Sequence, residues 1–90
     1  MKIALKCNFF NRSEIELETQ AATLAALLDE LSKNQELTTI EFFDSESGEL
    51  YPDCELLLNG QSYQLLNQGL DTKLKDDDEI ELIMFTLAGG

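Results

Sequence analysis

The closing pair of glycines, Gly89-Gly90, is the feature of the sequence with the clearest chemical use. Glycine has no Cβ, so its backbone fits a narrow channel and adopts angles that other residues avoid. A free α-carboxylate at the end of such a segment can enter another protein's nucleotide pocket, attack ATP and become an acyl-adenylate. This activation needs only the carboxylate from the chain, because the partner supplies ATP, metal and nucleophile. The alternative interpretation is a frayed terminus without a role.

Several other chemistries are excluded by the residue inventory. The sequence has no histidine, which rules out Ser-His-Asp and Cys-His nucleophiles and the usual zinc ligand sets. Cys7 and Cys54 form no CxxC motif; we expect Cys7 to face the core and Cys54 to be partly exposed, without a basic neighbour to activate it. The acidic run at 76–79 lacks the ligand spacing of a calcium loop and is predicted to be a solvated turn. We therefore expect no metal site and no bound cofactor.

The charge balance restricts the partners. Eighteen acidic residues against six basic ones give a net charge of −12. Phosphate backbones and anionic membranes repel such a chain, so we expect neither nucleic acid nor membrane as a partner. A partner with a basic surface suits it, and a charge that only maintains solubility is the alternative. No apolar stretch is long enough for a signal peptide or a membrane span, so we expect a cytoplasmic protein with reduced thiols.

The elements that must position the carboxyl end begin with a hairpin and a helix, within one predicted domain over 1–90. Apolar residues alternate over 3–9 and again over 14–18 around a polar turn, which predicts a β-hairpin. The spacing then becomes helical, with Thr23 as the expected N-cap and Asn34 expected to end the helix in the left-handed conformation. The apolar stripe of this helix consists of Leu24, Leu27, Leu28 and Leu31.

The middle of the chain gives weaker signals. Over 35–54 we predict only a short strand near 40–43 and an acidic turn after it. Residues 55–58 are predicted to form a strand that ends in the two-residue turn Asn59-Gly60. The apolar side chains of Tyr63, Leu65 and Leu66 are expected to pack on the core.

The last predicted strand covers 79–85 and leads to the glycine pair. Alternation directs the even-numbered apolar residues from Ile80 to Met84 toward the core. Ile83, Phe85 and Leu87 then share the opposite face, where we predict a partner-docking patch surrounded by charge. The alternative is that they pack under residues 40–54. Along the chain, two predicted strands precede the helix and two follow it, and the helix is expected to cross one sheet. This order predicts the α+β class.

The order of four short stretches resembles the MoaD/ThiS family of ubiquitin-like sulfur carriers. These are Leu57–Gly60, Gly69–Asp76, Asp78–Ile80 and Leu87–Gly90. The start of the helix at Thr23-Leu24 is also similar to this family. The resemblance is best over 57–90, weaker over 1–34 and absent from 35–54. Each stretch alone is too short to be specific. The resemblance to this family rests on their order together with the chain length and the terminal glycines.

The resemblance implies a β-grasp fold with a mixed sheet, one main helix packed across it and a reactive tail at 86–90. It implies that a ubiquitin-activating-type enzyme uses ATP to adenylate the carboxylate of Gly90, with Ala88 and Gly89 as the thin segment that leads to it. The adenylate is then converted to a thiocarboxylate that gives its sulfur to a synthase subunit. In this role the chain is a protein substrate and not a catalyst.

The acceptor of the sulfur stays open between several pathways. Small subunits of molybdopterin synthase usually carry a Pro-Pro pair where this chain has Met84-Phe85-Thr86. That stretch is more similar to ThiS or to the ubiquitin-related modifier group, whereas the length favours the molybdopterin type. The alternatives are a subunit that completes the molybdopterin synthase active site, a sulfur donor for tRNA or for the thiamin thiazole, and a ubiquitin-like modifier joined to lysines.

Overall fold

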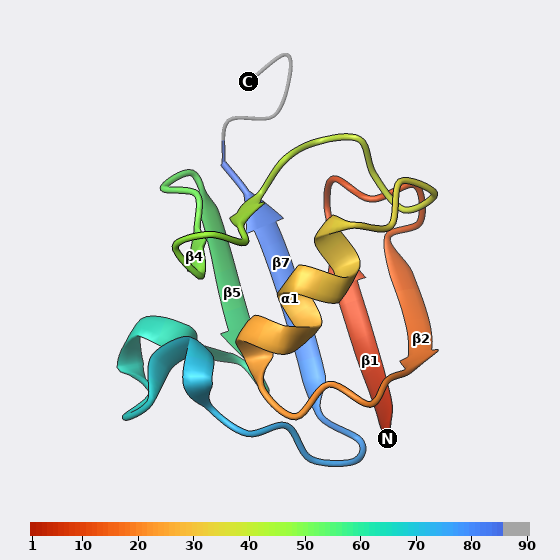
Figure 1. The fold of residues 1–90 in the computed structure, drawn as a ribbon. Coiled ribbons are helices and arrows are strands. Elements are labelled where there is room, and N and C mark those ends of the chain that lie inside the picture. The colour runs from red at the N-terminus through yellow and green to blue at the C-terminus, as the bar shows by residue number, and fades with distance from the viewer. Residues whose placement is uncertain (86–90) are drawn as a thin grey trace.

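A five-stranded sheet in the order β2-β1-β7-β5-β6 carries one helix, α1, across a single face (Figure 1). The computed structural model describes residues 1–85. The strands of this sheet are β1 (Lys2–Cys7), β2 (Glu14–Glu18), β5 (Cys54–Leu58), β6 (Gln61–Ser62) and β7 (Glu79–Met84). The remaining elements are α1 (Leu24–Ser32), the two-stranded sheet of β3 (Phe43–Asp44) and β4 (Glu49–Leu50), and the 3₁₀ helices η1 (Tyr63–Leu65) and η2 (Gly69–Asp71). The predicted α+β class is confirmed.

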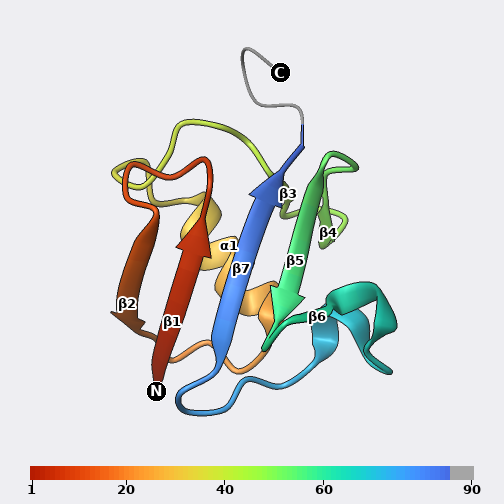
Figure 2. The same cartoon turned by 180° about the vertical axis from the view of Figure 1, so that it is seen from behind.

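The last strand lies at the centre of the sheet, between the first strand and β5 (Figure 2). β7 pairs in parallel with β1, with Leu5 opposite Ile80, and antiparallel with β5, with Leu56 opposite Leu82. β1 and β2 form the predicted antiparallel hairpin. A parallel pair needs a long crossover connection, which α1 and the following segments supply here. The chain therefore reaches residue 85 from the middle of the sheet.

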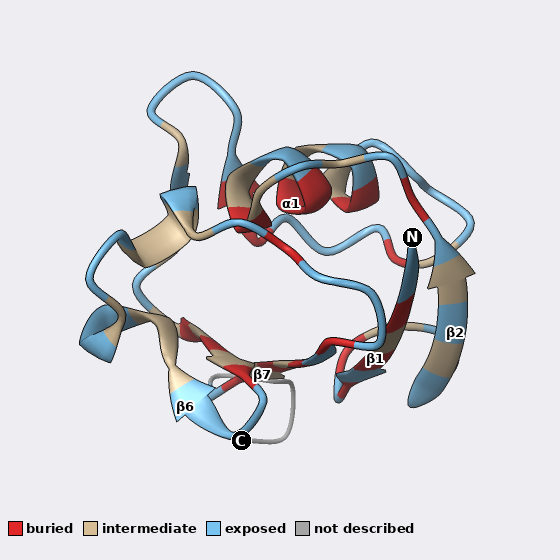
Figure 3. Cartoon of the chain, turned by 90° about the horizontal axis from the view of Figure 1, so that it is seen from below, coloured by how far each residue is buried: buried red, intermediate tan, exposed pale blue. Residues whose placement is uncertain are grey.

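Helix α1 buries its leucine stripe against the sheet, as its spacing predicts. All four predicted leucines have at most 4% of their surface exposed, and Figure 3 shows the buried side of α1 facing the strands. The side-chain oxygen of Thr23 accepts from the N–H of Ala26 at 3.2 Å, which confirms the predicted N-cap. The prediction for Asn34 is wrong, because Lys33 ends the helix in a right-handed conformation and Asn34 has no positive φ.

Both cysteines lie in the core between α1 and the sheet. Cys7 is 4% exposed, as expected, but Cys54 is only 6% exposed, so the prediction of partial exposure is wrong. Cys54 begins β5, and the pairing of β5 with β7 turns its side chain inward, a placement that local sequence does not reveal. Burial raises the pKa of the Cys7 thiol to about 11 and that of Cys54 to about 12. Neither thiol is a nucleophile near neutral pH.

The segment after α1 forms its own small hairpin beside the main sheet. The predicted strand exists only as Phe43–Asp44, paired with Glu49–Leu50, and Ile40 lies outside it with 39% of its surface exposed. Phe42 is fully buried, and its ring packs on that of Phe9 with the centroids 5.2 Å apart. The segment is thus anchored to the core by an aromatic contact rather than by a long strand.

The connection from β5 to β7 begins with the predicted tight turn. Asn59 and Gly60 have φ values of 52° and 87°, the left-handed region that such a turn requires. Tyr63 and Leu66 pack against the core as expected, but Leu65 is 71% exposed. The one-turn helix η1 directs Tyr63 and Leu65 to different sides, so the prediction for Leu65 is wrong.

The acidic run before β7 forms the predicted turn, in which Asp76, Asp77 and Glu79 are exposed and only Asp78 is buried. The carboxylate of Asp76 accepts from the backbone N–H of Lys2 at 2.8 Å. Asp78 is 8% exposed and accepts from the Asn59 side chain at 3.0 Å and from the N–H of Lys75 at 2.8 Å. These bonds fasten the start of β7 to both of its neighbouring strands. Within residues 1–85, no helix has the length and apolar character needed to cross a bilayer.

Candidate functional site

The end of β7 is the part of the structure nearest to the predicted reactive group. Of the predicted site residues, Ile83 and Phe85 are described, while Leu87, Ala88, Gly89 and Gly90 lie outside the described residues. The tail, defined as residues 86–90, continues directly from this end. The site is therefore built here from the residues that surround the start of the tail.

The two described members of the predicted docking patch lie on the face of the sheet away from α1. Met84 is 7% exposed and points into the core, so its neighbours Ile83 and Phe85 point outward. Ile83 is half-buried and Phe85 is 65% exposed. Phe85 does not pack under residues 40–54, the alternative that the sequence left open. An aromatic side chain in this position can be covered by another protein.

Hydrogen bonds from both neighbouring strands hold the backbone at the end of β7. On one side the N–H of Phe85 donates to the carbonyl of Asp53 at 2.9 Å. On the other side the Asn8 side chain accepts from the N–H of Met84 at 2.9 Å and donates to its carbonyl at 3.2 Å. Sequence analysis missed Asn8, because the pair is separated by 76 positions and no local pattern marks it.

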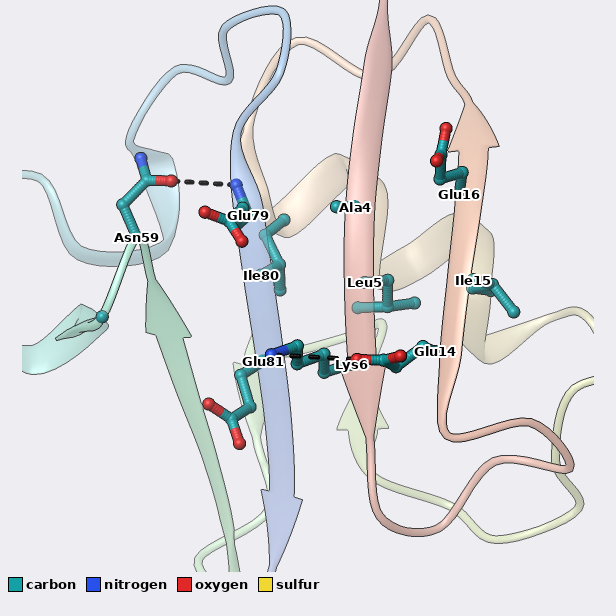
Figure 4. Close-up of a pocket in the computed structure, with 11 residues that line it drawn as sticks. Ala4, Leu5, Lys6, Glu14, Ile15, Glu16, Asn59, Glu79, Ile80 and Glu81 are labelled. Carbon is teal, nitrogen blue, oxygen red and sulfur yellow. Dashed lines mark hydrogen bonds and ion pairs between the residues drawn. The ribbon is translucent and has the colours of Figure 1, made fainter.

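The same outer face carries a shallow acidic groove of about 680 Å³. It lies over Ala4, whose small side chain leaves room between β2 and β7 (Figure 4). Four glutamates line it, two from β2 and two from β7: Glu14, Glu16, Glu79 and Glu81.

Two lysines on β1 offset only part of this negative charge. Lys6 lies 3.8 Å from Glu14, and Lys2 lies 3.3 Å from Glu16, whose hydrogen bond and charge raise the pKa of Lys2. All four side chains are more than half exposed, so these ion pairs contribute little to stability. Acidic charge therefore extends over the sheet face that also carries Ile83 and Phe85.

Within residues 1–85, no group of three or more acidic or cysteine side chains is arranged to hold a metal ion. The described part does carry an apolar patch beside a negative surface, an arrangement suited to recognition of another protein. No curated protein sequence matches the chain. A sequence model of the ThiS family matches residues 5–90.

The chain belongs to the ThiS family. Solved structures of similar shape cover nearly its whole length and confirm the predicted β-grasp fold. This ThiS-family chain is similar to the HVO 2177 protein of Haloferax volcanii, with 25% identity and a TM-score of 0.69 over 100% of this chain and 87% of the other. It is also similar to the small archaeal modifier protein 1 of Methanosarcina acetivorans, with 26% identity and a TM-score of 0.68 over 99% and 96%.

A third structure shows the fold alone. Urm1 from Trypanosoma brucei is 22% identical, with a TM-score of 0.71 over 99% of this chain and 95% of the other. The family match places this ThiS-family chain among ubiquitin-like sulfur-carrier proteins, and the three neighbours share its fold. Proteins of this family are generally small carriers rather than enzymes.

Proposed function

We propose that the carboxylate of Gly90 is adenylated by a ubiquitin-activating-type enzyme and converted to a thiocarboxylate that donates sulfur in cofactor biosynthesis. The observation that carries this proposal is the ThiS-family match, which extends to Gly90 and thus includes the Ala88-Gly89-Gly90 segment. Glycine at both final positions leaves the backbone thin enough to enter a partner's nucleotide pocket.

The proposed chemistry has two steps, and the chain contributes only its terminal group. In the first step a carboxylate oxygen of Gly90 attacks the α-phosphorus of ATP. The bond between the α-phosphorus and the bridging oxygen breaks, and pyrophosphate leaves. In the second step hydrosulfide attacks the acyl carbon; the carbon–oxygen bond to the adenylate breaks and AMP leaves. The product is an acyl thiocarboxylate, with the proton of hydrosulfide released to solvent. ATP belongs to the partner, so the chain needs no bound cofactor.

We propose that Ile83, Phe85 and Leu87 form the surface on which the partners dock. The exposure of Phe85 and the half-buried position of Ile83 support this role. The acidic groove on the same sheet face favours a partner whose contact surface is basic around an apolar centre. Two partners need such a surface, namely the adenylating enzyme and the synthase subunit that receives the sulfur.

For the sulfur acceptor we favour a molybdopterin precursor, on the basis of the 90-residue length. The Met84-Phe85-Thr86 stretch is instead more similar to carriers for the thiamin thiazole or for tRNA thiolation. The thiocarboxylated chain, offered separately to each acceptor system, should lose its sulfur to one of them. In the molybdopterin case the chain would also complete the active site of the synthase as its small subunit.

A second candidate function is supported by one comparison. The Methanosarcina acetivorans neighbour, 26% identical over nearly the whole chain, is described as a small archaeal modifier protein. In a modifier the adenylated Gly90 is attacked by a lysine amine instead of a sulfur nucleophile, and AMP leaves as an isopeptide bond forms. Both functions share the first step and differ only in the second.

The intact mass of the protein tests the proposal. The untreated chain must end at Gly90, and incubation with a ubiquitin-activating-type adenylase from the same genome, ATP and sodium sulfide should replace one oxygen by sulfur. A matched variant that lacks Gly90 should keep its fold and show no change in mass. An unchanged mass for the full chain with every such adenylase of that genome contradicts the proposal. Conjugates of higher mass in cell lysate, absent from the deletion variant, support the modifier function instead.

A further inference from the structure

The side chain of Asn8 continues the β1–β7 ladder beyond the end of β1. In the parallel pair, the N–H of Asn8 donates to the carbonyl of Leu82 at 3.3 Å. The next bond of a regular parallel ladder would run from the N–H of Met84 to the backbone carbonyl of Asn8. Here the side-chain oxygen of Asn8 accepts that N–H at 2.9 Å, and its amide nitrogen donates to the Met84 carbonyl at 3.2 Å. A carboxamide has one acceptor and one donor group, so it satisfies both polar groups of one residue.

The regular ladder ends after Cys7, where the chain begins its turn toward β2. Phe9 is 7% exposed, and its ring packs against Phe42. β1 ends at Cys7, which pairs with Leu82, two positions short of Met84. Without a side chain that reaches across, the N–H and carbonyl of Met84 on this side would have no partner among residues 1–85.

On the opposite side of β7, backbone groups at the start of β5 hold the end of the strand. Cys54 pairs with Met84, and the N–H of Phe85 donates to the carbonyl of Asp53 at 2.9 Å. This is the last backbone hydrogen bond along residues 1–85. Five residues follow Phe85, and an extended chain of five spans at most about 18 Å. The position of Met84 and Phe85 therefore sets the volume that the Gly90 carboxylate can reach.

We propose that Asn8 is a positioning residue for the tail: by holding Met84 in the ladder, it fixes the point and direction from which residues 86–90 leave the sheet. This inference rests on the proposed function, because its consequence is the delivery of the Gly90 carboxylate into an adenylating site. A reacting group that starts from a fixed point loses less freedom on reaching the transition state, and a small displacement of such a group lowers the rate strongly.

Replacement of Asn8 should slow the chemical step more than it weakens docking. In Asn8→Ala both bonds to Met84 are lost, and the end of β7 opens more often. The apolar side chains of the docking patch are unchanged. We expect kcat for adenylation, measured as ATP–pyrophosphate exchange, to fall roughly tenfold, while the KM for the carrier changes by less than about twofold.

The chain offers a matched control at the opposite end of the same strand. The side chain of Asn59 accepts from the N–H of Glu79 at 2.9 Å and donates to Asp78 at 3.0 Å, so it holds the start of β7 as Asn8 holds its end. Because Asn59 has a φ of 52°, the control is Asn59→Gly, which removes the side chain without strain. It disturbs β7 far from the tail, and we expect its kcat to stay within about twofold of the unchanged chain.

The experiment compares the unchanged chain, Asn8→Ala and Asn59→Gly by ATP–pyrophosphate exchange and by hydrogen exchange of backbone amides. In Asn8→Ala the amide of Met84 should exchange roughly tenfold faster, while the amide of Leu82 keeps its protection. Should Asn8→Ala be unfolded, Asn8→Asp replaces it, because a carboxylate still accepts from Met84 but cannot donate to its carbonyl. For that variant we expect kcat to fall at least roughly threefold.

Three results would overturn the positioning role: full kcat in the Asn8 variant, a change in KM alone, or an equal loss of kcat in Asn59→Gly. The first shows that the Met84 bonds do not affect delivery. The second shows a docking role, and the third a general effect of strand stability. If the unchanged chain gives no exchange with any adenylase of its genome, the proposed function itself fails, and the positioning role fails with it.

Discussion

The exposed ring of Phe85 should contribute to partner binding much more than to folding. It is 65% exposed, and full burial of a large apolar side chain stabilises by about 1.5–3 kcal/mol. A partner that covers the exposed two-thirds therefore gains about 1–2 kcal/mol, so Phe85→Ala should weaken the Kd for the adenylating enzyme about 5- to 30-fold. The third that is already buried limits the loss in the free energy of unfolding to below about 1 kcal/mol.

Isothermal titration calorimetry with the adenylating enzyme and urea unfolding measure these two quantities. The matched control is Leu65→Ala, because Leu65 is 71% exposed but lies on η1, which packs against β5 at the end of the sheet where β7 begins. It should leave the Kd unchanged within about twofold. Equal weakening by both variants, or a Kd for Phe85→Ala that matches the unchanged chain, would refute the assignment of the docking surface.

Three further predictions concern the body that carries the tail. Thr23→Ala removes the N-cap bond to Ala26 and should lower the free energy of unfolding by about 1 kcal/mol in urea titration, whereas Thr23→Ser should retain it. Leu27→Ala leaves a cavity at a side chain that is 0% exposed, and the free energy of unfolding should fall by about 2–5 kcal/mol in the same urea titration. Burial raises the pKa of Cys7 from 9.0 to about 11 and that of Cys54 from 9.0 to about 12. Above pH 9 the unfolded chain therefore loses thiol protons that the folded chain retains until the pH reaches these higher pKa values. The stabilising contribution of both thiols is complete below pH 9 and is lost as the pH rises through this window. Urea titrations up to pH 11 should show a steeper decline of the free energy of unfolding than for the double variant Cys7→Ala, Cys54→Ala; equal slopes would show that the two thiols do not cause it.

Most of the regular elements follow from local patterns in the sequence. The helical spacing of four leucines predicts α1, because an amphipathic helix is stable only when its apolar stripe is covered. The alternation from Ile80 to Met84 predicts which face of β7 is buried. Asn59-Gly60 predicts its turn, because few other residue pairs adopt two successive positive φ angles.

The failures at Cys54 and Asp78 share one physical cause, which is that a contact with a distant segment decides the outcome, whereas the failure at Leu65 is local. Cys54 has polar and charged neighbours in the sequence, yet pairing with Met84 buries it. Asp78 belongs to an acidic run that is typical of a solvated turn, yet the Asn59 side chain and the N–H of Lys75 compensate its burial. Leu65 is apolar, yet it points outward because Tyr63 and Leu66 already occupy the adjacent core positions.

The sequence by itself determined the family, the terminal glycines and the side of β7 that faces outward, because each is encoded in residue order or in a period of two. Only the tertiary structure decided that β7 lies in the centre of the sheet and that Asn8 bonds to Met84 across 76 positions. Strand neighbours depend on how the whole chain closes, and local residue types carry no record of that closure. The residues that hold the start of the tail therefore became visible only once the strands were paired.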